Sequence, residues 1–258
     1  MIPIGRVPDY RKSPQQLFTQ VAKHFVLITE PFSILSSAGI GHPGAFLTFG
    51  DLNLGKGYRV SRGSQTQVTL YQDGTSLEGM AVYLDQIIAL STAHLLSAED
   101  DIFQIDSEGH AFHFGDLKLQ HDWHREARDL VNLHAHPPLE TRADLEEAFW
   151  RTLCGDTEVT SRPAPSHFET YYTSWVELPD RLQSFIQEDG SLDTLPEDEE
   201  FWGLIGMANQ WGVAMGQGCA ARRICVLKEG YIGLVPSGTK VGDVRWVFLG
   251  VPRPYVLR

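Results

Sequence analysis

The sequence predicts an α+β fold: a helical middle layer packed with mostly antiparallel β-strands, and a C-terminal antiparallel β-sheet. Two observations lead to this prediction. Apolar residues recur at helical spacing behind N-terminal capping residues, early in the 258-residue chain and again in its middle. Strand-like runs separated by turn residues occupy residues 67–90 and residues 221–258.

The first part of the chain predicts a helix, a loop and strands. A helix over residues 13–29 can start with Ser13 as its cap and Pro14 at its first position, where no N–H is needed. Residues 39–67 are rich in glycine and poorly periodic, and we interpret them as a flexible loop. Residues 67–90 predict strands around a turn, and residues 100–119 predict one more hairpin.

The middle and the end of the chain complete the fold. The predicted helices cover residues 122–133, 141–154, 179–187 and 199–213, and Gly155 ends the second of them. The predicted final strands cover residues 222–227, 231–235, 243–249 and 255–257. We interpret residues 1–258 as a single domain whose terminal sheet segment is 221–258.

Charge and composition exclude several classes of function. Acidic residues outnumber basic ones 33 to 21, for a net charge of −12, which argues against a general nucleic-acid or membrane-surface binder. No run approaches the roughly 18–20 apolar residues of a membrane span, and residues 1–6 lack the apolar stretch of a signal peptide. The three cysteines lack metal-type spacing and predict buried thiols in a reducing, cytoplasmic compartment.

Histidines give the candidate catalytic residues. His121 and His124 are three residues apart and share a helix face, and His134 and His136 form a His-x-His pair before two prolines. The imidazoles of these two pairs could together bind a zinc ion. The alternative is that His121 and His124 lie on the surface of a polar helix, and that His134 and His136 lie at a helix C-terminus, where the helix dipole favours histidine. We predict no metal and no cofactor. The acidic pair Glu146-Glu147 is interpreted as part of a solvated helix face.

Aromatic residues late in the helical part give the candidate substrate-binding residues. They are Tyr171, Tyr172, Trp175, Trp202 and Trp211. Aromatic side chains in this number can line a small-molecule pocket. The alternative is that they form the core between the helices and the terminal sheet.

The C-terminal segment resembles a known family. Its residues are Arg222–Leu227, Gly230–Pro236, Gly242-Asp243, Leu249-Gly250 and Pro254–Arg258. This order of a strand, a Gly-x-x-Gly-x-x-Pro hairpin, a Gly-Asp turn, an apolar strand and a final Pro-x-x-Leu-Arg resembles the closing segment of fungal heterokaryon-incompatibility (HET) proteins. Residues 149–156 and pieces of residues 9–36 are similar to other parts of that family. The resemblance implies that the chain corresponds to the region after the HET domain, and that this domain is absent. It assigns no catalytic residue.

Two hypotheses for the function follow. The first is a HET-like accessory or recognition module without its effector domain, which binds a protein partner and catalyses nothing. The second is a small isomerase, cyclase or hydrolase of fungal secondary metabolism. That enzyme would bind a small apolar ligand in an aromatic-lined pocket and use a histidine and a carboxylate for acid–base chemistry.

Overall fold

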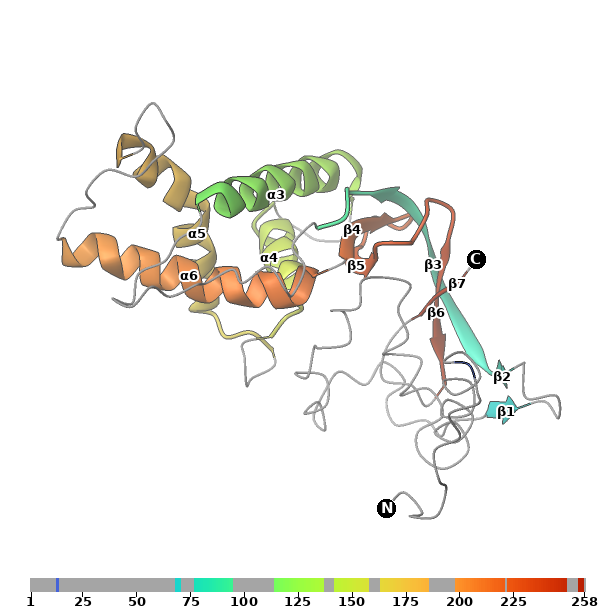
Figure 1. The fold of residues 1–258 in the computed structure, drawn as a ribbon. Helices are drawn as coiled ribbons and strands as arrows, with labels where there is room; N and C mark the ends of the chain where they lie inside the picture. Colours follow the sequence, from blue (N-terminus) through green and yellow to red (C-terminus); the bar gives the residue numbers. More distant parts are fainter. Residues whose placement is uncertain are drawn as a thin grey trace, which may run out of the picture. The chain divides into compact units, whose positions relative to one another are not determined.

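The structure is a computed structural model with helices and antiparallel strands, which confirms the α+β prediction (Figure 1). It describes residues 13, 68–70, 77–94, 114–136, 142–157, 163–185, 198–220, 222–249 and 255–257. The helices are α3 (Phe114–His134), α4 (Arg142–Leu153), α5 (Phe168–Leu182), the short 3₁₀ helix η3 (Gln183–Phe185) and α6 (Glu199–Cys219). The strands are β1 (Val68–Leu70), β2 (Leu77–Gly79), β3 (Ala81–Leu90), β4 (Arg222–Leu227), β5 (Ile232–Pro236), β6 (Val244–Phe248) and β7 (Tyr255–Leu257).

Some of the predictions lie outside the described residues. They are the helix over residues 13–29 apart from Ser13, the loop over 39–67, and the 100–113 part of the predicted hairpin. The chain divides by its internal contacts into two compact units. One contains residues 1–39, 58–82 and 246–255, and the other contains residues 40–57, 83–245 and 256–258. Because much of the first unit is not described, the single-domain interpretation stays a prediction.

Two helices begin earlier than predicted. Helix α3 starts at Phe114 and not at Asp122, so residues 114–119 are helical although the sequence predicted part of a hairpin there. Helix α5 starts at Phe168 and not at Pro179. Its buried residues, Phe168, Tyr172, Ser174, Trp175, Leu178 and Leu182, form a continuous helical stripe. A proline inside a helix costs about 3 kcal/mol, and burying each large apolar side chain contributes roughly 1.5–3 kcal/mol, so the stripe outweighs Pro179.

Helices α4 and α6 start close to their predicted positions. Asp198 caps α6, since its side chain accepts a hydrogen bond from the Glu200 N–H at 3.1 Å. The helix continues six residues beyond the predicted end at Val213, as far as Cys219. The predicted stop of α4 at Gly155 is confirmed, because Gly155 follows the helix with a φ of 64°.

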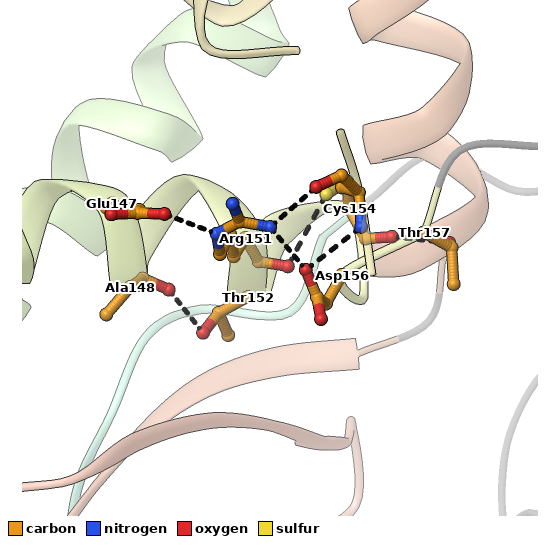
Figure 2. Close-up of polar contacts among 8 residues, drawn as sticks. Glu147, Ala148, Arg151, Thr152, Cys154, Asp156 and Thr157 are labelled. Carbon is orange, nitrogen blue, oxygen red and sulfur yellow. Dashed lines mark hydrogen bonds and ion pairs between the residues drawn. The ribbon is translucent and has the colours of Figure 1, made fainter. Parts of the chain in front are cut away.

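The end of α4 is held by the side chain of Arg151 (Figure 2). Its guanidinium donates to Glu147 Oε1 at 2.8 Å, to Asp156 Oδ1 at 2.8 Å and to the Ala164 carbonyl oxygen at 2.7 Å. Asp156, with a φ of 54°, also accepts from the Ala164 N–H at 3.2 Å. One side chain therefore ties the last turn of the helix to the loop that leads into α5.

The larger sheet has the strand order β5-β4-β3-β6-β7, and β1 pairs with β2 in a separate antiparallel hairpin. The predicted β4–β5 hairpin is confirmed as an antiparallel pair. The C-terminal strands predicted within residues 221–258 all belong to this antiparallel sheet, and they are joined in it by β3, which lies between β4 and β6. Its backbone bonds to both neighbours: the Ile87 N–H donates to the Asp243 carbonyl at 3.0 Å, and Ile87 pairs with Leu227.

Buried polar side chains hold β3 against β4. The Asp85 carboxylate accepts from the Glu229 N–H at 2.9 Å, and Ser91 Oγ accepts from the Ile224 N–H at 3.0 Å. Both side chains are buried. Because an unpaired buried polar group costs about 1–3 kcal/mol, these bonds disfavour any other register of the two strands.

The helices and the β4–β5 hairpin surround one aromatic-rich core. Its largest fully buried members are Phe149, Trp150, Phe168, Trp175 and Trp211. The other face of β4 is buried as well, since Cys225 and Leu227 form a second cluster with Ile87 and Val235. Among the described residues, no helix is both long and apolar enough to cross a membrane.

The β4–β5 turn lies close to the main chain at the end of α3, and this close contact can be tested by substitution of Gly230. Gly230 has a φ of 86°, and a Cβ built on it would lie 2.4 Å from the His136 carbonyl carbon. We expect Gly230→Ala to lower the free energy of unfolding by roughly 2–5 kcal/mol, from backbone strain and from overlap with the main chain. Urea denaturation measures this loss.

Gly242 provides the matched control. Its φ is 94°, but apart from its chain neighbours no atom of the residues that the structure describes lies within 4 Å of a built Cβ. Gly242→Ala should therefore show the backbone strain alone, about 1–2 kcal/mol. Equal losses in the two variants would contradict the close approach of the turn to His136.

Candidate functional site

Two candidate histidines and two candidate aromatic residues meet between α3 and α5. The His121 ring stacks on the Trp175 ring, with centroids 3.7 Å apart and an interplanar angle of 13°. The His124 ring lies edge-on to the same indole at 5.2 Å and within 5.8 Å of the Tyr172 ring. The i,i+3 spacing that suggested a shared helix face thus brings both imidazoles to α5.

A hydrogen-bond chain runs from His124 through Tyr172 to Glu146. The distance from His124 Nε2 to the Tyr172 hydroxyl oxygen is 3.1 Å, and this hydroxyl donates to Glu146 Oε1 at 2.8 Å. A tyrosine hydroxyl has one hydrogen, so the His124 Nε2–H must be the donor to Tyr172. Arg128 donates to the other carboxylate oxygen of Glu146 at 2.7 Å. The chain connects three helices and sets the tautomer of His124.

Burial keeps both imidazoles neutral. The exposed fractions of His121 and His124 are 9% and 4%. Burial, and then the charge of Arg125, lowers the pKa of His121 to about 4, against the opposing effect of Asp122. Burial, and then His121 and two arginines, lowers the pKa of His124 to about 3. Burial and the neighbouring Glu146 raise the pKa of Tyr172. None of these groups titrates near pH 7, where acid–base catalysts are most effective.

The remaining aromatic candidates divide into two sets. Trp211 of α6 belongs to the cluster, because its ring lies edge-on to Tyr172 with centroids 5.1 Å apart. The Tyr171 ring contacts His167 and Phe168, and the Trp202 ring contacts Phe201. The structure therefore joins Tyr172, Trp175 and Trp211 to the histidines, and it places Tyr171 and Trp202 elsewhere on their helices.

The other histidine pair does not reach this cluster. His134 is the last residue of α3 and half-buried, and His136 follows the helix with an exposed side chain. Both residues thus lie at a helix C-terminus, which was the alternative to a metal site in the sequence analysis. Within the described part of the chain, no three His, Cys, Asp or Glu side chains gather as metal ligands.

The sequence did not indicate Glu146, which belongs to the site, or His94, which lies near it. Glu146, interpreted as part of a solvated face, takes part in the hydrogen-bond chain although its side chain is about a third exposed. His94 is buried and lies edge-on to Trp123, with centroids 4.6 Å apart. Burial lowers the pKa of His94 to about 4. Neither residue has a partner within a few positions in the sequence, so no local pattern marks it.

The cysteines are packing residues, as predicted. Cys154, Cys219 and Cys225 are free and buried. The Cys219 thiol lies 3.2 Å from the Leu153 carbonyl oxygen, to which it donates. Burial raises the pKa of Cys154 and of Cys225 to about 11, which leaves little nucleophilic thiolate at neutral pH.

The hydroxyl of Tyr172 can be tested by Tyr172→Phe. This change leaves the buried His124 Nε2–H without its acceptor and removes one donor to Glu146. We expect the free energy of unfolding to fall by about 1–3 kcal/mol. Tyr171→Phe is the matched control, since Tyr171 is half-buried and its contacts with the described residues are ring contacts, and it should change stability by less than about 0.5 kcal/mol. Equal midpoints for both variants in urea denaturation would contradict the chain.

Known proteins provide no relative for this site. No protein-family model, no curated protein and no solved structure matches the chain. The resemblance to HET proteins stays a prediction, and the function has to be inferred from the contacts of the chain itself.

Proposed function

We propose that this chain is a recognition module, HET-like as its C-terminal segment suggests, that binds a protein partner and catalyses no reaction. The single observation that carries this proposal is the burial of His121 and His124 among aromatic rings. An acid–base catalyst has to touch its substrate and to change protonation near the working pH. The rings of these two histidines are packed on their neighbours, and burial keeps them neutral.

Strand β3 supports the recognition half of the proposal. Met80, directly before the strand, and Val82 and Leu84 within it alternate along the chain and share one face, and all three are exposed, with Val82 at 52%. A strand that borders water normally alternates apolar residues facing in with polar residues facing out. An apolar outward face is a feature of surfaces that bind other proteins.

The enzyme of the second hypothesis has one observation in its favour. Residues from the catalytic and the substrate-binding candidates meet in one cluster, and His124 is linked to a carboxylate through Tyr172. For this cluster to act on a small apolar ligand, the helices would have to open far enough to admit it.

Chemical modification separates the two functions. Diethyl pyrocarbonate acylates accessible neutral imidazoles, and peptide mass spectrometry locates the modified histidines. At pH 7 we expect exposed His136 to react readily, and His121 and His124 to react at least roughly a hundredfold more slowly than His136, because their modification needs an opening of the core. Modification of His124 in the folded protein as fast as that of His136 would support the enzyme instead.

Substitutions on β3 test the recognition surface. We expect Val82→Lys and Leu84→Lys to weaken binding of the partner at least tenfold, since each places a charge in an apolar interface. Leu133→Lys, at a side chain of α3 that is 69% exposed, is the control and should bind like the wild type. The unfolding free energies of all three should stay within about 1 kcal/mol of the wild type.

The assay compares which proteins the variants and the control retain from an extract of the cells that encode the chain. A protein retained by the wild type and by Leu133→Lys, and lost with both β3 variants, supports the proposal. Retention of the same proteins by every variant would contradict a role for β3 in recognition.

A further inference from the structure

Two of the contacts that attach α3 to the rest of the second unit contain a buried imidazole. Towards α5, the helix presents His121 and His124 to Trp175 and Tyr172. Towards the end of β3, Trp123 Nε1–H donates to the Thr92 carbonyl at 3.0 Å, and the buried His94 ring lies against the Trp123 indole. Helices α5 and α6 pack closely along each other through apolar and aromatic residues, whereas α3 adds these histidines to its own apolar core residues. Helix α3 is therefore the element whose packing depends most on uncharged histidines.

The polar atoms around these rings favour the neutral state. His121 Nε2 and both ring nitrogens of His94 are buried and have no hydrogen-bond partner among the residues that the structure describes. A buried charge without a partner costs far more than a buried neutral ring. A proton added to the ring of His121 or of His94 would therefore find no hydrogen-bond acceptor among the described residues.

The charged groups nearby cannot compensate for such a proton. On α3 itself, Arg125 and Arg128 follow the two histidines, and Asp122 is half-exposed and paired with Arg125 at 3.3 Å. On α4, Glu146 already accepts from Arg128 and Tyr172, and α5 faces the pair with Tyr172 and Trp175. Near β3, Glu126 binds Thr92 through both carboxylate oxygens. On β4, Arg222 and Arg223 donate to main-chain carbonyls.

We infer that His121 and His124 act as an acid-operated latch: while neutral they hold α3 on α5, and when protonated they release it. The two ring centroids are 6.4 Å apart, so the second proton would also meet the charge of the first. This inference is independent of the proposed function, since it concerns the packing of α3 and not a ligand.

The direction of the pH dependence follows from linkage. A released imidazole has an ordinary pKa near 6.5, whereas burial lowers the pKa values of the docked rings to about 4 and about 3. Docking is therefore at full strength above about pH 6.5 and weakens as the pH falls below it. Between about pH 6 and 4.5, each imidazole that takes up a proton should raise the equilibrium constant for release roughly tenfold per pH unit. For His121 and His124 together the rise is roughly a hundredfold per pH unit.

Hydrogen exchange of the full chain between pH 7.5 and 4.5 tests the latch, with each rate divided by the intrinsic rate at that pH. Most of the stability of a helix in a protein comes from tertiary packing, so the amides of α3 exchange once it is released. We expect protection in α3 to fall by more than tenfold per pH unit below pH 6, while α6 keeps its protection. His121→Phe, which keeps a flat ring for Trp175 but cannot titrate, should reduce the dependence by about one proton.

Two further variants complete the test. His136→Gln, which removes an exposed imidazole, should leave the pH dependence unchanged. If His124→Phe lowers the stability of the protein, the slope against pH still reports the number of protons taken up and should also fall by about one. Protection of α3 that stays flat down to pH 4.5 would overturn the inference. So would an equal, simultaneous loss in α3 and α6, because that pattern is global unfolding.

Discussion

The hydroxyl group of Tyr172 joins three of the helices at one point. It accepts from His124 of α3 and donates to Glu146 of α4, and Tyr172 itself belongs to the buried stripe of α5. Burial of apolar surface supplies most of the stabilising free energy, but it is not directional and would tolerate other helix rotations. The three-residue chain is directional, and any rotation of one helix would leave a buried donor or acceptor unpaired. The aromatic packing of Trp175 and Trp211 is thereby confined to a single arrangement.

The sheet is also fixed by directional hydrogen bonds of buried side chains. Asp85 and Ser91 lie close to the two ends of the β3 segment that pairs with β4, and each accepts a backbone N–H of the β4–β5 hairpin or of β4. Arg151 does the equivalent at the end of α4, where it binds a side chain within the helix and a carbonyl beyond it. In all three places a buried or half-buried polar group bonds to a partner that is distant in the sequence. These bonds select the topology, whereas the apolar residues stabilise any compact form.

The elements with local signals were the predictable ones. The β4–β5 hairpin follows from alternation around Lys228-Glu229-Gly230, and the shared face of His121 and His124 follows from helical spacing. The start of α5 was missed because Pro179 suggested a first turn, although Phe168, Tyr172 and Trp175 already had helical spacing. The central position of β3 and the pairing of Glu146 with Tyr172 had no local signal. Both depend on contacts between residues far apart in the chain, which periodicity does not encode.

The polarity of the described residues supports the proposal of a binding module over that of an enzyme. An active site usually exposes titratable groups in a concave surface and keeps apolar residues around them. In the described part of the chain the distribution is the reverse: three histidines are buried among aromatic rings, and Val82 and Leu84 of β3 face water. The desolvation that makes the histidines useful for packing also lowers their pKa values, so that at pH 7 they are poor proton donors and weak bases. Packing of this cluster requires buried, neutral histidines, whereas acid–base catalysis at neutral pH requires accessible histidines that titrate near pH 7. The observed burial of these histidines fits packing.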